Sequence, residues 1–106
     1  MIQIFVFVPE EHKEVVKSAT MFEAGGGRIG HYDSCCFEHA GVGQFRPLEG
    51  SHAFLGKIGE IEKVREVKIE MVCEDHLFEE IIKAMKSAHP YEEPAFYGIK
   101  TVGYSV

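Results

Sequence analysis

Side chains that can bind metals alternate along one segment of the chain, from His31 to His39. On an extended strand, alternate side chains share one face, and neighbours on that face stand roughly 6.5–7 Å apart at the backbone. Imidazole, carboxylate and thiolate groups are ligands for zinc or copper. The pattern therefore offers four candidate metal ligands: His31, Asp33, Cys35 and His39. Phe37 interrupts the polar row, so a strand with Cys35 and Phe37 in the core and exposed histidines at its ends fits the pattern better.

A second segment of unusual composition, residues 89–94, reads His-Pro-Tyr-Glu-Glu-Pro. Pro90 and Pro94 each disfavour helical geometry in the residue before them. The backbone is therefore restrained, which favours a binding site because the side chains are held at low entropic cost. The candidate ligand-binding residues are His89, Tyr91 and Glu92. The alternative is a polar turn, in which His89 interacts with the dipole at a helix C-terminus and the acids are solvated.

Two arginines, Arg46 and Arg28, are candidates for the same site, since a guanidinium could attract a small anionic ligand. Arg46 is followed by Pro47, with Glu49 close behind, so these residues could equally form a rigid ion-paired turn. A divalent metal is the alternative ligand and the one cofactor that the residues suggest. Its affinity would fall below a pH of about 6.5, where imidazole takes up a proton.

Catalytic groups are harder to find in the sequence. Cys35 and Cys36 point to opposite faces of a strand, so they should not act together. A catalytic cysteine also needs a nearby base and an electropositive site, which a sequence alone cannot show. An enzyme that uses Cys35 or Cys36 is therefore the weaker alternative. Gly25, Gly27 and Gly30 match a dinucleotide-binding pattern, but they follow a helix, whereas the pyrophosphate needs a helix that begins there. We therefore expect a protein that is not an enzyme.

The hydrophobic periodicity predicts the elements that must position these residues. Alternation and β-branched residues favour a strand, whereas apolar residues three and four apart favour an amphipathic helix. Asp75 is the expected N-cap of the second helix. The predicted strands cover residues 2–8, 31–39, 42–46, 64–73 and 95–101, the predicted helices cover 10–24 and 75–88, and a long loop covers 47–60.

This order of elements is typical of an α+β, ferredoxin-like (βαββαβ) fold, with both helices on one face of an antiparallel sheet. We expect one domain over residues 1–106, with an extra strand or hairpin and a long loop between residues 31 and 62. Phe5 and Phe7 then lie on the sheet face that lacks helices. Burial against another subunit would cover them, and the alternative cover is the loop at 47–60.

Three motifs carry a resemblance to a known family: residues 27–30 (Gly-Arg-Ile-Gly), 43–50 (Gly-Gln-Phe-Arg-Pro-Leu-Glu-Gly) and 88–95 (Ala-His-Pro-Tyr-Glu-Glu-Pro-Ala). Together they resemble the middle domain of the YqfO/YbgI, or NGG-one interacting factor three, family. That domain is similar to CutA and PII signalling proteins. The resemblance implies a stand-alone version of this inserted PII/CutA-like domain, assembled as a trimer, with His89, Tyr91 and Glu92 at a cleft between subunits.

The same resemblance limits what can be inferred about activity. In the full-length family, histidines and carboxylates of two flanking lobes are thought to hold a pair of metal ions, and we do not expect those lobes or that hydrolase role in this chain. The family often has a histidine and a single cysteine after the Tyr-Asp/Ser pair. This chain instead reads Tyr-Asp-Ser-Cys-Cys-Phe over residues 32–37, so a role for this strand does not transfer.

Composition excludes several partners and compartments. The chain of 106 residues has 11 basic and 17 acidic residues, for a net charge of −6. We expect no nucleic-acid partner, because binding to the phosphate backbone usually requires a basic face. No apolar stretch approaches about 18 residues, so we expect no membrane span. Residues 2–8 lack the pattern of a signal peptide, and three cysteines make a poor disulfide framework, which favours the cytoplasm.

The function that these observations favour is a non-catalytic, oligomeric module that binds a small ligand or has a regulatory role. It resembles PII and CutA proteins in this respect. The alternative is a divalent metal-binding protein of the metal-tolerance kind.

Overall fold

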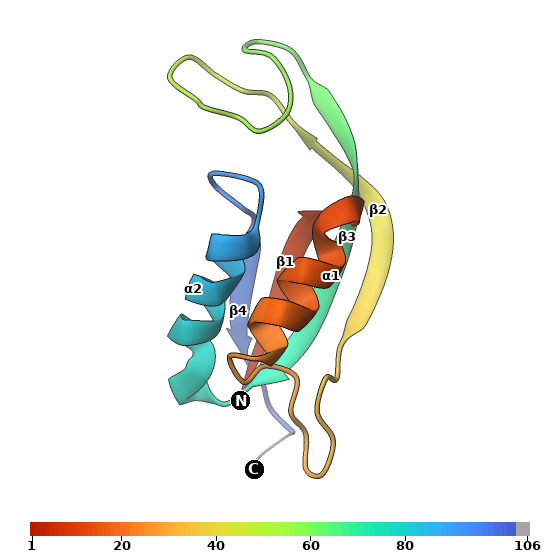
Figure 1. The fold of residues 1–106 in the computed structure, drawn as a ribbon, viewed down its shortest axis with the longest axis vertical. Helices are drawn as coiled ribbons and strands as arrows, with labels where there is room; N and C mark the ends of the chain where they lie inside the picture. Colours follow the sequence, from red (N-terminus) through yellow and green to blue (C-terminus); the bar gives the residue numbers. More distant parts are fainter. Residues whose placement is uncertain (104–106) are drawn as a thin grey trace.

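The computed structural model describes residues 1–103. Four strands and two helical regions follow one another in the order that the sequence predicts (Figure 1). The strands are β1 (Ile2–Pro9), β2 (Phe37–Phe45), β3 (Glu62–Cys73) and β4 (Phe96–Lys100). The first helical region comprises η1 (Glu10–His12), α1 (Lys13–Val16) and the π-helix η2 (Lys17–Phe22). The second comprises η3 (Asp75–Leu77) and α2 (Phe78–Ala88).

The strands form one antiparallel sheet in the order β2-β3-β1-β4. This is the order of a ferredoxin-like fold, in which each helical region connects two strands that are not adjacent in the sheet. The register pairs Ile4 of β1 with Met71 of β3 and with Gly98 of β4. β2 and β3 are the longest strands, and the loop between them lies at one end of the molecule, beyond β1 (Figure 1).

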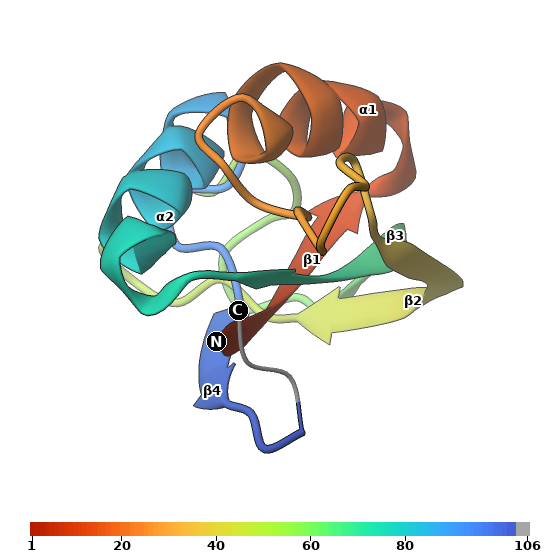
Figure 2. The same ribbon diagram turned by 90° about the horizontal axis from the view of Figure 1, so that it is seen from below.

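Alternation along the strands separates a core face from an open face. The side chains of Ile4, Val6, Ile69 and Met71 are at most 3% exposed and pack under both helices. Figure 2 shows α1 and α2 on the same side of the sheet. Phe5 and its neighbours at alternate positions lie on the other face, which no helix of the described chain covers. The predicted fold class and the side on which the helices lie are confirmed.

The first helical region differs from the regular helix predicted over residues 10–24. It changes from 3-10 to α to π geometry along its length. Val15 is 47% exposed, whereas Val16 and Met21 are fully buried. Lys13 and Lys17 donate hydrogen bonds to the carboxylate of Glu38, at 2.8 and 3.0 Å, and so tie this region to β2.

The prediction of two strands over residues 31–39 and 42–46 is wrong. β2 is a single strand over Phe37–Phe45, and among the described residues the stretch before it makes only one isolated bridge, between Ile29 and Tyr32. Gly41 and Gly43 both pair with β3 in regular register, so the strand continues through them. The extra strand or hairpin therefore does not exist in residues 1–103, while the long loop before β3 does.

Asp75 was the expected N-cap of the second helix, but it does not cap α2. Residue Leu77 precedes α2, and no side chain accepts a hydrogen bond at this position. The carboxylate of Asp75 instead accepts from the amino group of Met1 at 3.2 Å and from Lys100 at 3.0 Å. It therefore links the start of β1 to the end of β4. No helix in residues 1–103 is long and apolar enough to cross a membrane.

Candidate functional site

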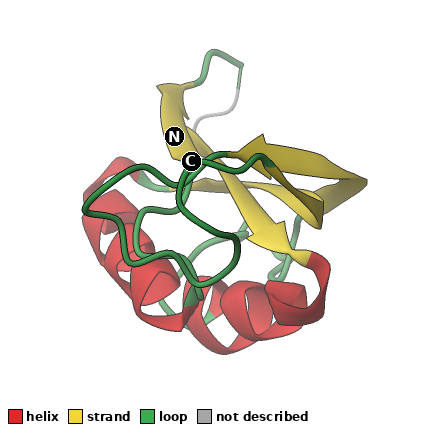
Figure 3. Cartoon of the chain, turned by 90° about the horizontal axis from the view of Figure 1, so that it is seen from above, coloured by secondary structure: helices red, strands yellow, loops and turns green. Residues whose placement is uncertain are grey.

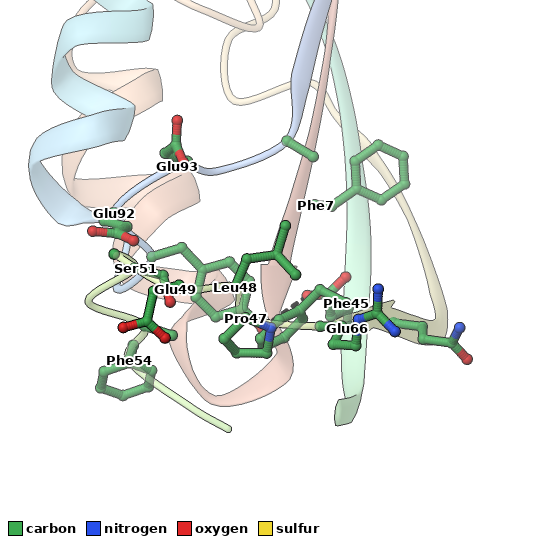
Figure 4. A pocket seen from close by; sticks show the side chains of 16 residues that line it. Phe7, Phe45, Pro47, Leu48, Glu49, Ser51, Phe54, Glu66, Glu92 and Glu93 are labelled. Carbon is green, nitrogen blue, oxygen red and sulfur yellow. Dashed lines mark hydrogen bonds between the residues drawn. The ribbon is translucent and has the colours of Figure 1, made fainter. Parts of the chain in front are cut away.

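A cleft of about 640 Å³ lies at the end of the molecule where the β2–β3 loop approaches the connector between α2 and β4. Figure 3 views this end directly, with the helices to one side and the strands to the other. The cleft is lined by residues of the loop (including Arg46, Leu48 and Ser51), of the connector (Tyr91 and Glu92) and of the sheet (including Phe7, Phe45 and Glu66). The side chains that line it are drawn in Figure 4.

His89 restrains the backbone of the connector between α2 and β4. Its side chain is buried, with 7% exposed, at the point where α2 ends. Nε2 donates to the carbonyl oxygen of Phe7 at 2.7 Å, and Nδ1 accepts from the backbone N–H of Tyr91 at 3.1 Å. Loss of hydration lowers the pKa of His89 below its usual 6.5. The imidazole is therefore neutral near pH 7, with both nitrogens occupied, and it does not line the cleft.

The side chain of Tyr91, whose backbone N–H is bound by His89, lines the cleft. Its hydroxyl donates to a carboxylate oxygen of Glu66 at 2.9 Å, and its ring packs edge-on against Phe45, with centroids 5.7 Å apart. Burial, with the charge of Glu66 beside it, raises the pKa of the Tyr91 phenol well above its usual range. The phenol therefore keeps its proton and acts as a donor, so the rings of Tyr91 and Phe45 and the carboxylate of Glu66 form one ordered cluster.

The loop is attached to the connector by Glu92. Its carboxylate accepts the backbone N–H of His52 at 3.0 Å. Further along the loop, the ring of Phe54 packs edge-on against His12 of η1, with centroids 5.7 Å apart. Within the loop, Gly59 N–H donates to the carbonyl of Pro47 at 2.8 Å, which closes the segment between them. These contacts define the second wall of the cleft.

The cleft is rich in negative charge. Four carboxylates line it, those of Glu49, Glu66, Glu92 and Glu93, against one cation, Arg46. Figure 4 shows Glu49 and Glu92 toward one side and Phe7, Phe45 and Glu66 toward the other. The expected alternative of an ion-paired turn between Arg46 and Glu49 does not occur, since Arg46 forms no ion pair within residues 1–103.

The predicted ligand-binding residues are only partly brought together. Tyr91, Glu92 and Arg46 line the cleft, and His89 lies directly behind it. The loop between η2 and β2, at residues 23–36, contains Arg28 and lies at the opposite end of the molecule (Figure 1). In a single copy of the chain, a ligand in this cleft would therefore meet one of the two predicted arginines, Arg46.

The four predicted metal ligands do not share one strand face. His31, Asp33 and Cys35 precede β2, and only His39 lies within it. The Sγ of Cys35 contacts the carbonyl oxygen of Asp33 at 3.6 Å, and His39 pairs with Glu70 at 3.1 Å. In the described part of the chain, no group of three or more histidine, cysteine or acidic side chains is arranged to hold a metal ion. The geometry assumed for this site is therefore wrong.

The remaining cysteines are poorly placed for nucleophilic chemistry. Burial raises the pKa of the Cys36 thiol, and it raises the pKa of Cys73 to about 11. Cys73 is also only 1% exposed, in the core at the end of β3. Both thiols are therefore protonated near pH 7, which is the unreactive form.

The open face of the sheet adjoins the cleft. A second hollow of about 520 Å³ lies on this face and shares Phe7 and Glu66 with the cleft. Phe5 and Phe7 are half-buried, because both pack edge-on against Tyr97 of β4, at 6.4 and 6.1 Å between centroids. The β2–β3 loop reaches Phe7 at the cleft, and Tyr97 remains 55% exposed.

Sequence reasoning missed Glu66 and Phe45 as members of the site. The alternation of β3 does contain a signal, because Val67 and Ile69 in the core place Glu66 and Lys68 on the open face. Nothing in the sequence, however, indicates that Tyr91 reaches Glu66, which lies 25 residues away in the chain.

Comparison with known proteins agrees with this fold. The chain is 43% identical over 94 residues to the GTP cyclohydrolase 1 type 2 homolog of Bacillus subtilis, covering 89% of this chain and 25% of that protein. The homolog from Mycobacterium tuberculosis is 44% identical over 91 residues, covering 86% and 24%. No protein-family model matches the chain. The chain thus spans about a quarter of the length of these relatives.

Solved structures show similarity to the same family and to the same fold. A Bacillus cereus protein related to NIF3 superposes with a TM-score of 0.79 at 42% identity, over 92% of this chain and 24% of that one. CutA from Xylella fastidiosa gives 0.70 at 18% identity, over 97% and 86%. The divalent cation tolerance protein CutA from Archaeoglobus fulgidus gives 0.69 at 17%, over 99% and 88%.

The fold places this chain among the ferredoxin-like domains of the CutA and PII type. In sequence, it is homologous to one segment of the NIF3-related family, whose members are named GTP cyclohydrolase 1 type 2 homologs.

Proposed function

We propose that this protein is a non-catalytic module that binds a small ligand in the cleft between the β2–β3 loop and the connector at residues 89–95. The observation that carries this proposal is the chain of hydrogen bonds from His89 through Tyr91 to Glu66. His89 holds the backbone of Tyr91, and Tyr91 holds Glu66 at the wall of an open cleft. Side chains fixed before binding lose little entropy when a ligand arrives.

The protonation states favour binding over catalysis. General acids and bases work best with a pKa near the working pH. Tyr91 at the cleft has a raised pKa, His89 behind it has a lowered pKa with both nitrogens occupied, and the thiols of Cys36 and Cys73 have raised pKa values. Each of these shifts keeps its group in an inert, uncharged form.

The active form that we propose is a homo-oligomer, most simply a trimer, that buries the open face of the sheet. Phe5, Phe7 and Tyr97 form an aromatic patch there, and Ile99 beside them is 54% exposed. Large exposed apolar patches commonly mark subunit contacts. Because Phe7 also lines the cleft, a subunit on this face would border the ligand site. Three free cysteines among the described residues support a location in the cytoplasm.

Divalent metal binding is the weaker alternative. One structural neighbour is called a divalent cation tolerance protein, but its similarity to this chain at 17% identity concerns the fold. The carboxylates of the cleft are the side chains that a hard cation would use. Within residues 1–103 they do not come together as a group that could hold an ion.

Backbone-amide NMR spectra, recorded while small probes of positive, zero and negative charge are added, test the proposal. We expect at least one probe to shift the amides of residues 45–54 and 89–95 in a saturable way, and not those near Arg28 at the opposite end. Tyr91→Phe should weaken this binding, because it releases Glu66. The proposal fails if no probe affects the cleft, or if all shifts map to other surfaces.

A further inference from the structure

We propose that the ligand of the cleft is an organic cation, an alkylammonium or guanidinium group, held between aromatic rings and the carboxylate of Glu66. This inference rests on the proposed function, since it takes the same cleft as the binding site and specifies the ligand's chemistry. Two independent features carry it: the arrangement of rings around Glu66, and an equivalent cation site that the chain fills with one of its own lysines.

Aromatic rings and a carboxylate meet at one wall of the cleft. Phe45 and Tyr91 pack edge-on at 5.7 Å, and Phe7 lines the same cleft. The Tyr91 hydroxyl donates to Glu66 at 2.9 Å, which places a half-buried carboxylate beside the two rings. Cations bind favourably over aromatic faces, and more so where water is partly excluded. A carboxylate at the edge of the rings adds direct attraction for the same positive charge.

On the neighbouring part of the open face, a lysine of the chain lies over a ring and beside a carboxylate. Lys68 places its Nζ 4.6 Å from the centre of the Phe5 ring and 3.7 Å from a carboxylate oxygen of Glu70. The ammonium is thus held by one ring and one acid of the sheet. Glu66 lies two residues before Lys68 on the same face, beside Phe45 and Tyr91. It forms no ion pair within residues 1–103, so here the rings and acid meet without a cation of the chain.

The wider cleft also favours positive charge. Glu49 and Glu93 line it and, in the described part of the chain, pair with no basic group, while Arg46 is the one cation in the lining. An anionic ligand would meet this excess of negative charge.

Two sources could supply this group: a free amine or guanidine, or a lysine or arginine side chain of a second copy of the chain. Both have the chemistry that the cleft selects. They differ in whether the cleft is already occupied in the assembled protein, so assembly provides the means to separate them.

The experiment compares three probes that share a four-carbon chain: n-butylammonium, 1-butanol and butyrate. Each is titrated into the native protein while the amide signals of residues 45–54 and 89–95 are followed by NMR. We expect n-butylammonium to bind at least about fivefold more tightly than 1-butanol, and butyrate most weakly, as attraction to one nearby carboxylate would give. Added salt should weaken only the binding of the ammonium probe.

Three variants locate the interaction. Glu66→Gln removes the charge but keeps an acceptor for Tyr91, and it should weaken n-butylammonium binding about fivefold. Phe45→Leu removes one ring and should weaken it about two- to fivefold. Glu79→Gln on the outer face of α2 removes the same charge far from the cleft, where Glu79 is exposed, and it should leave the affinity unchanged. An equal effect of Glu79→Gln and Glu66→Gln would show general electrostatic attraction and overturn the inference.

The same titration on Phe5→Ser, which is expected to dissociate the oligomer and adds no charge beside the cleft, separates the two sources. Equal affinity in wild type and variant identifies a free organic cation, whereas tighter binding to the variant identifies a side chain of the second copy. If 1-butanol or butyrate binds the cleft as well as n-butylammonium, the cation inference is wrong and the proposed binding function stands. If no probe perturbs the cleft in either the wild type or the dissociated variant, both are wrong.

Discussion

Acidification should destabilise this protein through His89. In the folded chain His89 is buried and neutral, with Nε2 donating to Phe7 and Nδ1 accepting from Tyr91. A second ring proton would remove the acceptor that Tyr91 uses and would place a charge in a poorly hydrated site. Burial is the main cause of the lowered pKa; the backbone carbonyl of Phe7 and the charge of Glu66 oppose it, and His12 adds slightly to it.

The sign and window follow from this pKa. In the unfolded chain His89 takes up a proton near its ordinary value of 6.5, whereas in the folded chain it stays neutral to lower pH. The unfolded state therefore binds more protons, and the free energy of unfolding falls as pH drops below about 6.5. The free energy of unfolding falls by about 1.4 kcal/mol for each unit by which the pKa in the folded chain lies below that in the unfolded chain. The fall is complete once the pH is below the pKa of the folded chain.

Urea unfolding between pH 7.5 and 5, on wild type and His89→Gln, measures this effect. Glutamine has a donor and an acceptor but does not titrate here, so the variant should start less stable and lose less stability on acidification. His76→Gln is the matched control, because His76 is exposed, and it should follow the wild type. His89→Ala should cost about 2–5 kcal/mol at pH 7, since it leaves the carbonyl of Phe7 and the N–H of Tyr91 unpaired.

Parallel stability curves for wild type and His89→Gln over this pH range would refute the reasoning. They would mean that His89 has the same pKa in both states, and hence that its ring is hydrated in the folded protein. The control separates this outcome from the general effect of replacing a histidine by glutamine.

Four further predictions follow from the same structure. Tyr91→Phe should lower the free energy of unfolding by about 1–3 kcal/mol, because it removes a hydrogen bond to the Glu66 carboxylate; unchanged urea curves would contradict this. Exchange of both Phe5 and Phe7 for Ser should give a folded, soluble monomer by light scattering, and a wild type that is already monomeric at micromolar concentration would contradict the proposed assembly. Cys73, with a pKa raised to about 11 and 1% exposure, should resist iodoacetamide at pH 8 until the protein unfolds. Mass spectrometry that finds Cys73 alkylated in the native protein would contradict this. Gly26→Ala should cost about 1–3 kcal/mol, because its Cβ would meet the Met71 sulfur and the Met21 carbonyl, and a melting temperature equal to wild type would show that this contact relaxes.

The fold could be predicted because its signals are local and repeated. The alternation of β3 from Val67 to Cys73 and the apolar stripe of α2 each follow one period over many residues. β2 was predicted less well, because Gly41 and Gly43 suggest a bend when read alone. In the sheet the carboxylate of Glu66 lies where a side chain at position 43 would stand. This reason for glycine depends on a strand 23 residues away and is invisible in the local sequence.

The candidate site was predicted in part for a similar reason. The two prolines restrain the connector that carries Tyr91 and Glu92, and both residues line the cleft, while their binding of a ligand stays a prediction. His89 was expected to face a ligand, but its ring satisfies two backbone groups instead, one of them in β1. Which backbone groups need a partner is decided by tertiary packing, so the choice between ligand and structural histidine could not be made from the sequence.

A crystal structure of the native assembly tests the central claim most directly. We predict that subunits contact one another through the open face around Phe5, Phe7 and Tyr97, and that the cleft beside Tyr91 and Glu66 stays open at the edge of this contact. A structure in which that face is exposed to solvent, or in which the loop at residues 46–61 fills the cleft, would contradict the account.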